Sequence, residues 1–248
     1  MKHSQQLGQN FVVMPFYLER MLSIAEIAPS DIVLEIGTGY GCLTSLLCEK
    51  AKKVLSFEID KKLYLYSKEK LSSYKNLLLF NADGLSCTEG FNKVVSNLPY
   101  SISKRFIYWL ALKTFQSATV MLQKDFVKKI MSPPGTKHYR AVSVISQLAF
   151  KLSLFDEVPP VAFNPVPKVH SMILKIEPVN PPLLNEFLMR MINYLSTFKG
   201  KKVNAIIKKT PFTDLNDIKN ISGLKEKRIE TLSPDEYLML ATFLSERI

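Results

Sequence analysis

The sequence predicts an α/β fold, in which helices cover both faces of a mainly parallel sheet, followed by a smaller helical region. Short apolar runs alternate with segments of helical periodicity up to residue 122, as expected for strands and helices that follow one another. Seven of the 14 prolines then fall within residues 159–182. Beyond them, residues 183–248 are helical in pattern and rich in lysine. A chain of 248 residues has room for one large domain with a small appendage, or for two domains.

The elements of the alternating region can be placed in order from their patterns. Residues 16–28 carry apolar groups at helical spacing, and Pro29 ends this predicted helix. The predicted strands are residues 32–36, 54–58, 77–80, 94–96 and 119–122. The predicted helices between them are residues 44–50, 61–71 and 103–112.

The proline-rich stretch separates the two regions. Residues 169–177 within it have the pattern of a further strand, which we expect at an edge of the sheet. Three prolines near its end predict a linker, namely Pro178, Pro181 and Pro182. We therefore expect one domain over residues 1–180 and a second, helical domain over residues 181–248.

Composition and charge restrict the class of protein. Apolar residues make up 47% of the chain, which allows a large core and argues against global disorder. The 33 Lys and Arg residues outnumber 22 acidic ones and give a net charge of +11. This excess favours polyanions such as nucleic acids as partners, although solubility alone also explains it.

The cysteines and the amino terminus indicate a cellular setting. Cys42, Cys48 and Cys87 lack the paired spacing of zinc ligands and do not suggest a disulfide framework. They are best explained as small apolar side chains in a reducing compartment. Residues 1–6 are polar, and no apolar run is long enough to span a bilayer. We expect a soluble cytoplasmic monomer with no metal and no membrane partner.

A glycine loop is the first motif that carries chemistry. Gly37, Gly39 and Gly41 occupy alternate positions between a predicted strand and a predicted helix. Glycine permits positive φ and lets a ligand approach the backbone, and ligands bind at this end of a strand in doubly wound folds. The spacing differs from that of dinucleotide-binding loops, and Cys42 stands where a P-loop would continue with lysine. Taken alone, such a glycine-rich loop is equally consistent with an ordinary tight turn between a strand and a helix.

Two acids at later strand ends strengthen this interpretation. Glu58 follows the loop by about 20 residues, where an acid commonly accepts hydrogen bonds from ribose hydroxyls. Asp83 ends the next strand and offers an acceptor for an adenine amine. For either acid alone, a solvated turn or a helix cap is the simpler interpretation. Together with the glycine loop, they predict a nucleoside-binding cleft.

The turn Asn97-Leu98-Pro99-Tyr100 ends the fourth predicted strand, at the same edge as the glycine loop. Pro99 restricts Leu98 to an extended geometry. The side-chain oxygen of Asn97 and the carbonyl of Leu98 would then form paired acceptors, which suit the two hydrogens of an exocyclic amine. Tyr100 can stack on the base. An ordinary strand exit explains this turn equally well when the glycine loop is left aside.

Four blocks of the chain, in this order, match one family. They are residues 7–12 (LGQNFV), 34–44 (LEIGTGYGCLT), 97–100 (NLPY) and 163–171 (FNPVPKVHS). They resemble the small-subunit ribosomal RNA adenine dimethyltransferases, the KsgA-like family. Fainter likeness at residues 123–124, 134–137 and 227–233 extends the resemblance over nearly the whole chain.

The resemblance implies a Rossmann-like S-adenosylmethionine-dependent methyltransferase domain, with a mostly parallel seven-stranded sheet, and a small helical domain that docks on rRNA. It implies that S-adenosyl-L-methionine, with S-adenosyl-L-homocysteine as product, contacts Asn10, Val12, Gly37, Gly39, Glu58, Ile59, Asp83, Gly84 and Asn97. The implied catalytic set is Asn97, Leu98, Pro99, Tyr100 and Phe163.

In this family Tyr100 and Phe163 would sandwich an adenine that is flipped out of the RNA. The implied reaction is dimethylation of the N6 amine of two adjacent adenosines near the 3′ end of small-subunit rRNA. The implied partner is therefore the rRNA of a pre-ribosomal small subunit, and the implied role is in subunit biogenesis.

Three positions depart from the family pattern. Thr38 replaces the usual proline between two glycines, and the order Ala82-Asp83-Gly84 replaces Gly-Asp-Ala. Met14 and Pro15 stand where an aspartate is common, so the resemblance says least about the start of the first helix. None of these changes removes a side chain that is predicted to contact a ligand.

Basic residues supply candidate phosphate contacts. Lysine contacts to phosphate give affinity without sequence information. The predicted RNA-binding residues are Lys124, Lys128, Lys137, Arg140, Lys168, Lys201 and Lys202. For any one of them, a solvated helix face is the simpler interpretation.

Three other functions remain open from the sequence. The related large-subunit rRNA methyltransferases share the overall pattern, although the Pro-Lys-Val segment at residues 167–169 favours the small-subunit group. A DNA amino-methyltransferase usually carries a Pro-Pro-Tyr turn instead. A binding protein that has kept a cofactor pocket without catalysis is the third, and the intact Asn97, Tyr100 and glycine loop argue against it.

Overall fold

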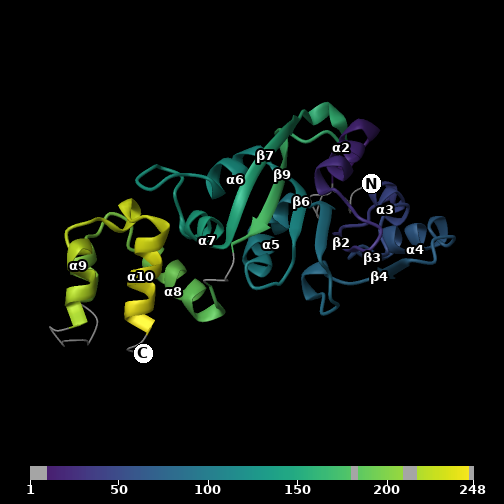
Figure 1. Cartoon of the computed structure of the whole chain (residues 1–248). Helices are drawn as coiled ribbons and strands as arrows, with labels where there is room; N and C mark the ends of the chain where they lie inside the picture. The colour runs from purple at the N-terminus through teal and green to yellow at the C-terminus, as the bar shows by residue number, and fades with distance from the viewer. Residues whose placement is uncertain (1–9, 180–183, 209–216, 246–248) are drawn as a thin grey trace. The chain divides into compact units, whose positions relative to one another are not determined.

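The computed structural model describes residues 10–179, 184–208 and 217–245 (Figure 1). Its described residues form two compact units. Unit 1 contains residues up to 109, with 113–127 and 151–178, and unit 2 contains residues 110–112, 128–150 and those from 179 onward. This division differs from the predicted one, because residues 128–150 belong with the carboxyl-terminal helices.

A seven-stranded sheet forms the centre of unit 1. Its strands are β2 (Ile32–Ile36), β3 (Lys53–Phe57), β4 (Leu77–Phe80), β5 (Lys93–Asn97), β6 (Ser117–Gln123), β7 (Phe150–Val158) and β9 (Ser171–Pro178). They lie in the order β4-β3-β2-β5-β6-β9-β7, and the five strands from β4 to β6 pair in parallel. The prediction of a mostly parallel seven-stranded sheet is therefore confirmed, with strand bounds that agree to within two residues.

The prediction that the last strand lies at an edge was wrong. Strand β9 pairs antiparallel with β6 and lies between β6 and β7, so β7 is the edge strand. Strand β7 was not predicted from the sequence. Its buried and exposed side chains do not alternate strictly, and Leu154 and Phe155 are both exposed. A strand without regular alternation lacks the main sequence signal for a half-buried strand.

Five α-helices, three short 3-10 helices and a small second sheet complete the described part of unit 1, the 3-10 helices being Gly84–Ser86, Tyr100–Ile102 and Pro160–Ala162. The helices are α2 (Pro15–Ala25), α3 (Cys42–Cys48), α4 (Lys61–Lys70), α5 (Ser103–Leu110) and α6 (Lys124–Ile130), the last two of which end in unit 2. Strands β1 (Phe11–Val12) and β8 (Phe163–Asn164) pair antiparallel. Buried Met21 of α2 and Leu47 of α3 share one hydrophobic cluster with Val33 and Val54 of the sheet. The pairing of β1 with β8 brings together two segments that are far apart in the sequence.

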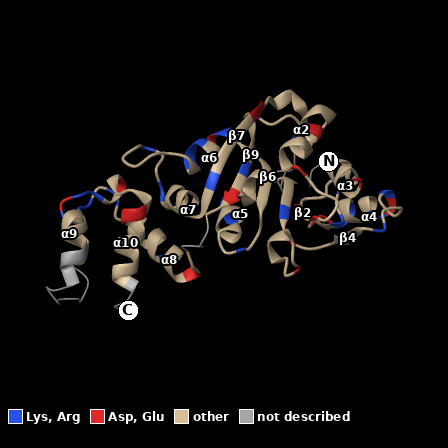
Figure 2. Cartoon of the chain, in the orientation of Figure 1, with Lys and Arg blue, Asp and Glu red and all other residues tan. Residues whose placement is uncertain are grey.

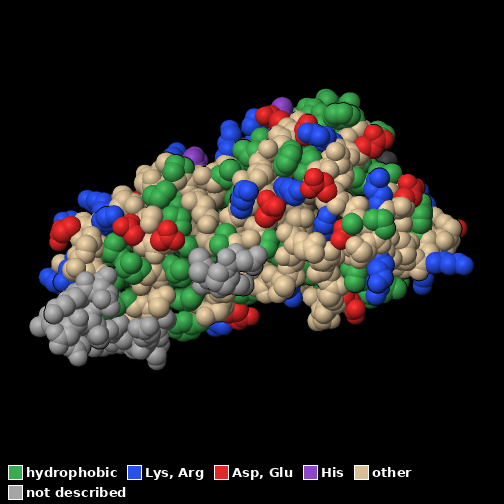
Figure 3. Space-filling view, in the orientation of Figure 1, with side chains coloured by type: hydrophobic (Ala, Val, Ile, Leu, Met, Phe, Trp, Pro, Cys, Tyr) green, Lys and Arg blue, Asp and Glu red, His purple; other side chains and the backbone are tan. Residues whose placement is uncertain are grey.

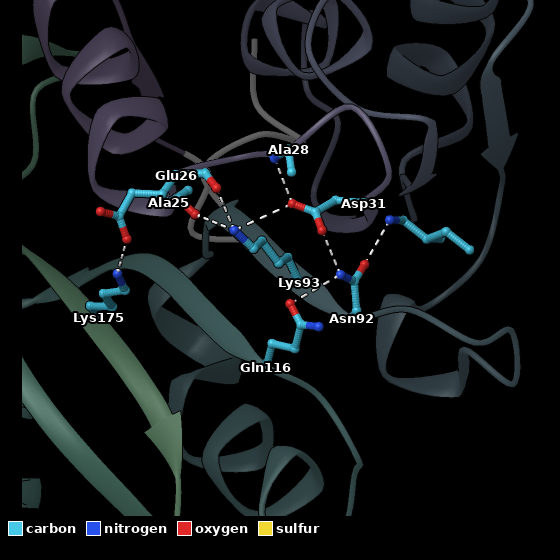
Figure 4. A network of polar contacts seen from close by, with 9 residues as sticks. Ala25, Glu26, Ala28, Asp31, Asn92, Lys93, Gln116 and Lys175 are labelled. Atoms are coloured by element: carbon cyan, nitrogen blue, oxygen red, sulfur yellow. Dashed lines mark hydrogen bonds and ion pairs between the residues drawn. The ribbon is translucent and has the colours of Figure 1, made fainter.

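Helix α2 ends earlier than predicted, where a polar network begins. Glu26 takes a left-handed conformation (φ 50°) and caps the helix through its N–H to the carbonyl of Leu22. Lys93 of β5 donates from Nζ to the carbonyl of Ala25 at 2.8 Å and lies 3.3 Å from the carboxylate of Asp31 (Figure 4). Asn92 donates to the other Asp31 oxygen at 2.6 Å. The network ties the end of α2 to the amino-terminal ends of β2 and β5.

The Lys93→Met variant should lower the free energy of unfolding by about 3 kcal/mol, because it leaves the buried Asp31 carboxylate and two backbone carbonyls without their cation. Urea denaturation followed by circular dichroism measures the change. As the matched control, Lys52→Met replaces an exposed lysine just before β3 and should be nearly neutral. Equal stabilities of the two variants would contradict a structural role for the network.

Unit 2 is helical within its described part. Its helices are α7 (Ala141–Ala149), α8 (Glu186–Ser196), α9 (Val203–Ile207) and α10 (Pro234–Ser245), with short 3-10 helices at Asp217–Leu224 and Ile229–Thr231. Helices α7, α8 and α10 contact one another pairwise. Most of α7 is buried, including Val144 and Ile145, so this apolar helix needs α8 and α10 as cover. That requirement explains why residues 128–150 fold with the carboxyl-terminal region.

The described helices of both units are short or amphipathic. None of them combines the length and the apolar composition needed to cross a bilayer.

Candidate functional site

One cavity of unit 1 collects the predicted site residues from four strand ends. It is lined by Asn10, Phe11, Ile36, Gly37, Gly39, Phe57, Glu58, Ile59, Ala82, Asp83, Gly84, Asn97, Leu98, Pro99, Tyr100, Ser101, Ile102 and Arg105. The residues follow β2, β3, β4 and β5, whose carboxyl ends meet at one edge because these strands are parallel. We call this the first cavity. All predicted cofactor residues except Val12 line it.

The glycine loop forms one wall of the first cavity. Gly37, Gly39 and Gly41 have φ values of 90°, 55° and 77°, which confirms the predicted need for positive φ. A Cβ atom on Gly39 would lie 3.0 Å from the ring of Phe11. A side chain at this position would therefore press on Phe11 and be strained by the positive φ, whereas glycine exposes the loop backbone to a ligand in the cavity.

Gly84 explains one of the departures from the family pattern. A Cβ atom at this position would lie 2.8 Å from the Cγ atoms of Ile36, a distance that real side chains do not reach. Glycine after Asp83 thus accommodates the branched Ile36 at the floor of the first cavity. The order Ala82-Asp83-Gly84 therefore places a glycine at the position that packs against Ile36 of β2.

Glu58 is held in the wall by the backbone. Its side chain is buried, with Oε2 accepting from the N–H of Gly39 at 2.8 Å and Oε1 accepting from the N–H of Asp60 at 2.9 Å. Burial raises the pKa of Glu58, and these backbone hydrogen bonds oppose the rise. Each carboxylate oxygen keeps a second lone pair, so a fixed acceptor faces the cavity for ligand hydroxyl groups.

Asp83 also lines the first cavity, and its partner was not predicted. Its Oδ1 accepts from the N–H of Leu85 at 3.0 Å, and its Oδ2 lies 3.0 Å from the Nη2 of Arg105. Arg105 is the fifth residue after Tyr100 and lies on α5, where it also lines the first cavity. The sequence gives no signal for this ion pair, because the two residues are 22 positions apart and neither belongs to a shared motif.

The Asn97 side chain has a defined orientation. Its Nδ2 donates to the carbonyl of Asn10 at 2.9 Å, which places the amide oxygen on the opposite side of the group. Leu98 is buried, and its N–H donates to the carbonyl of Met121 on β6 at 3.3 Å. The phenol of Tyr100 shares a 2.6 Å hydrogen bond with the hydroxyl of Ser171. The turn is thus anchored to the N-terminal segment, to β6 and to β9.

Phe163 is not part of the first cavity. Its side chain is only 1% exposed and packs in the hydrophobic cluster under α2. Its strand β8 pairs with β1, opposite Val12. Stacking of Phe163 on a base stays a prediction, and it requires the ring to become accessible when RNA binds.

A second cavity adjoins the first and contains Val12. It shares Phe11, Gly37, Gly39 and Asn97 with the first cavity. Asn97 therefore lies at the junction of the two cavities, with the acids Glu58 and Asp83 on one side only.

Glu35 and Thr38 extend the site into the core. Thr44 and Ser56 each donate a hydroxyl to Oε2 of Glu35 at 2.6 Å, and Ser56 shares a further 2.6 Å hydrogen bond with Thr38. The usual proline at position 38 could not make that last contact. Burial raises the pKa of Glu35 to about 8, opposed by the two hydroxyls and assisted by the nearby Glu58.

A raised pKa means that the folded chain keeps a proton on Glu35 that the unfolded chain releases near the ordinary value of 4.5. The stability contribution of Glu35 is therefore fully present below that value and is lost as the pH rises through about 8. The Glu35→Gln variant has no such proton. Urea denaturation at pH 5 and pH 8 should show its stability, relative to the wild type, rising with pH. A difference independent of pH would contradict the shift.

The predicted RNA-binding residues are mostly exposed, and they differ in their ion pairs. Figure 2 shows that Lys and Arg occur along the described parts of both units. Lys124 forms an ion pair with Glu157, and Lys202 forms one with Glu226 at 2.6 Å. Lys128, Lys137, Arg140, Lys168 and Lys201 are exposed. On the face drawn in Figure 3, basic side chains are interspersed with acidic ones. No finding on the described residues tests these RNA contacts, which stay predictions.

Comparison with solved structures identifies the class of protein. A dimethyladenosine transferase from Plasmodium falciparum has a TM-score of 0.82 and 26% identity, and the match covers 95% of this chain and 98% of that one. The 23S rRNA methyltransferase ErmE has a TM-score of 0.67 and 27% identity, with coverage of 95% and 100%. The fold is that of the S-adenosylmethionine-dependent methyltransferases.

Sequence comparison narrows the class to a family. The model of the ribosomal RNA adenine dimethylase family matches residues 1–246. A ribosomal RNA small subunit methyltransferase A from Caldanaerobacter subterraneus is 34% identical, over 98% of each chain. A probable enzyme of the same name from Methanosarcina mazei is 34% identical, over 95% of this chain and 91% of its own length. The chain belongs to the ribosomal RNA adenine dimethylase family and is an rRNA adenine dimethyltransferase.

Proposed function

We propose that this enzyme dimethylates the N6 amines of two adjacent adenosines near the 3′ end of small-subunit rRNA, within a pre-ribosomal small subunit. The observation that carries the proposal is the composition of the first cavity. The glycine loop, the acids Glu58 and Asp83 and the whole Asn-Leu-Pro-Tyr turn line one space. A nucleoside cofactor and an exocyclic amine can therefore meet there.

The residues present fit S-adenosylmethionine. Buried Glu58, fixed through both oxygens, suits the ribose hydroxyls, and Asp83 suits the adenine amine. The loop at Gly37 and Gly39 leaves room for the amino-acid part because side chains are absent there. When bound, this cofactor supplies an electrophilic methyl group on a sulfonium.

The turn would orient the target amine. We assign the amide oxygen of Asn97 and the carbonyl of Leu98 as acceptors for the two amine hydrogens, so that the nitrogen lone pair faces the methyl group. Tyr100, fixed by Ser171, would support the base through ring contact. Positioning provides the main acceleration in this scheme, and Asn97 does not act as a general base.

Large-subunit rRNA is the second candidate substrate, favoured by the structural likeness to ErmE. The relatives named small subunit methyltransferase A, which match over nearly their full lengths, favour the small subunit instead. Separate incubation of unmethylated small and large subunits with the enzyme and cofactor distinguishes the two. Mass spectrometry of the digested rRNA should find dimethyladenosine in two adjacent positions near the 3′ end of the small-subunit RNA. Modification only in the large subunit would overturn the proposal.

We also propose that unit 2 docks on rRNA through its exposed basic residues. Truncation after residue 180 is a poor test, because it would uncover α7 by removing α8 and α10. The double variant Lys201→Gln, Lys202→Gln removes two exposed charges and leaves α8 and α10 in place over α7. Its affinity for small subunits should fall, and the slope of log affinity against log salt should decrease by roughly 0.7–0.9 for each phosphate that the variant no longer neutralises. An unchanged salt dependence would exclude these two residues from the interface.

A further inference from the structure

The rim of the second cavity carries a connected group of aromatic rings. Tyr40, which stands between two glycines of the loop, is 46% exposed, and Tyr66 of α4 is 50% exposed. The rings of Phe11 and Tyr40 lie 4.6 Å apart between centroids, and those of Tyr40 and Tyr66 lie 5.5 Å apart. The last two are nearly perpendicular, at 87°. About half of each tyrosine is exposed, so ring surface is available to another flat group.

Helix α4 holds Tyr40 in place. Ser67 donates to the carbonyl of Gly39 at 2.6 Å, and Lys70 donates from Nζ to the carbonyl of Tyr40 at 2.9 Å. The same ammonium group lies 5.8 Å from the ring centroid of Tyr66. One turn of a helix thus fixes two successive carbonyls of the glycine loop. The backbone that carries Tyr40 is therefore held in place before any ligand binds.

The charges around Tyr40 and Tyr66 suit a polyanion. Lys62 and Lys70 line the second cavity beside the two tyrosines. Asp60, the acidic residue of this rim, is engaged in capping α4, where Oδ1 accepts from the N–H groups of Lys62 and Leu63. The other acid of the lining, Glu35, is 1% exposed and belongs to the core. Aromatic faces beside lysines are the usual composition of a site for single-stranded nucleic acid.

We propose that Tyr40 and Tyr66 bind the base of a nucleotide adjacent to the target adenosine, one ring by stacking and the other, perpendicular to it, by an edge-to-face contact. Lys62 and Lys70 face the phosphates of that nucleotide. The inference rests on the proposed function, because it takes RNA as the substrate. The cavities meet at Asn97, so a strand whose target adenine reaches the turn has its neighbouring nucleotide near this rim. The predicted cofactor acids Glu58 and Asp83 do not line the second cavity. Other predicted cofactor residues do line it, so the rim with Tyr40 and Tyr66 borders the cofactor site.

Helix α4 provides a matched control. Lys68 lies 5.8 Å from the ring centroid of Tyr64, the same arrangement as Lys70 and Tyr66. Neither Tyr64 nor Lys68 lines either cavity. Replacing Tyr64 with alanine therefore removes the same kind of surface pair from the same helix without touching the proposed subsite.

The test compares Tyr66→Ala, Tyr40→Ala, Tyr40→Phe and Tyr64→Ala in steady-state methylation of small-subunit RNA. The Tyr40→Ala and Tyr66→Ala changes should each raise the KM for RNA about ten-fold, because each removes one ring contact with the base. The kcat and the affinity for S-adenosylhomocysteine should be unchanged, because the cofactor cavity is intact. Tyr40→Phe and Tyr64→Ala should behave as the wild type, since Phe keeps the stacking face and Tyr64 lies outside the subsite.

A binding measurement reports the stack directly. RNA with 2-aminopurine on either side of the target adenosine should lose fluorescence on binding the wild type, and much less on binding Tyr66→Ala. If the wild type methylates rRNA but Tyr40→Ala and Tyr66→Ala both keep the wild-type KM and the wild-type quenching, the inference is overturned and the proposed function stands. Weakened cofactor binding in Tyr66→Ala would instead assign the rim to the cofactor and also overturn it. Failure of the wild type to methylate rRNA would remove the proposed function, and the inference with it.

Discussion

The Asn97→Ala variant is expected to lose methyl transfer by about 100-fold or more, with little change in its affinity for small subunits. Asn97 lies at the junction of both cavities, and its Nδ2 is fixed by the carbonyl of Asn10. Its removal deletes one of the two acceptors for the target amine and releases the N-terminal segment. Single-turnover transfer of a labelled methyl group to small-subunit rRNA measures the effect.

Two controls make the Asn97 result specific. Calorimetry with S-adenosylhomocysteine measures cofactor affinity. An unchanged affinity would show that the loss of activity comes from poor orientation of the target amine and not from weaker cofactor binding. Asn164→Ala removes an exposed asparagine that lines only the second cavity, and it should retain a normal kcat. Robust single-turnover transfer by Asn97→Ala would overturn the role assigned to this side chain.

Glu58→Ala is expected to weaken cofactor binding by about 100-fold. The change removes the acceptor proposed for ribose and strands the N–H groups of Gly39 and Asp60, which hold the loop. Glu58→Gln keeps one acceptor oxygen and should fall between alanine and the wild type. Calorimetry with S-adenosylhomocysteine gives the affinities, and the exposed Glu69→Ala on α4 is the control.

The pH dependence of this binding has a defined sign. Burial raises the pKa of Glu58, and only the ionised carboxylate accepts through both oxygens. Affinity should therefore fall as the pH drops through that raised pKa, and the fall should vanish in Glu58→Gln. If Glu58→Ala folds and binds the cofactor normally, the Glu58 carboxylate holds the backbone of the glycine loop and does not contact the cofactor.

The sequence predicted those parts of the fold that have a strong local signal. Strands β2 and β4 were placed at their observed bounds, because each is a short, mainly apolar run. The glycine loop was predicted because three positive φ values need glycine. The acids Glu58 and Asp83 were found because strand ends in a parallel sheet share one edge.

Features that depend on tertiary contacts were missed. The ion pair of Arg105 with Asp83 joins two segments without a common motif. Burial of Phe163 depends on how β8 pairs with β1, a two-residue contact with no periodicity. The place of α7 in unit 2 depends on which helices cover its apolar surface, and sequence pattern alone does not name a helix's partners.

The most direct test of the central claim is nucleoside analysis of unmethylated small subunits after incubation with the enzyme and labelled S-adenosylmethionine. N6,N6-dimethyladenosine should carry the label with the wild type, and it should be nearly absent with Asn97→Ala. Complete absence of labelled dimethyladenosine with the folded wild-type enzyme would contradict the account.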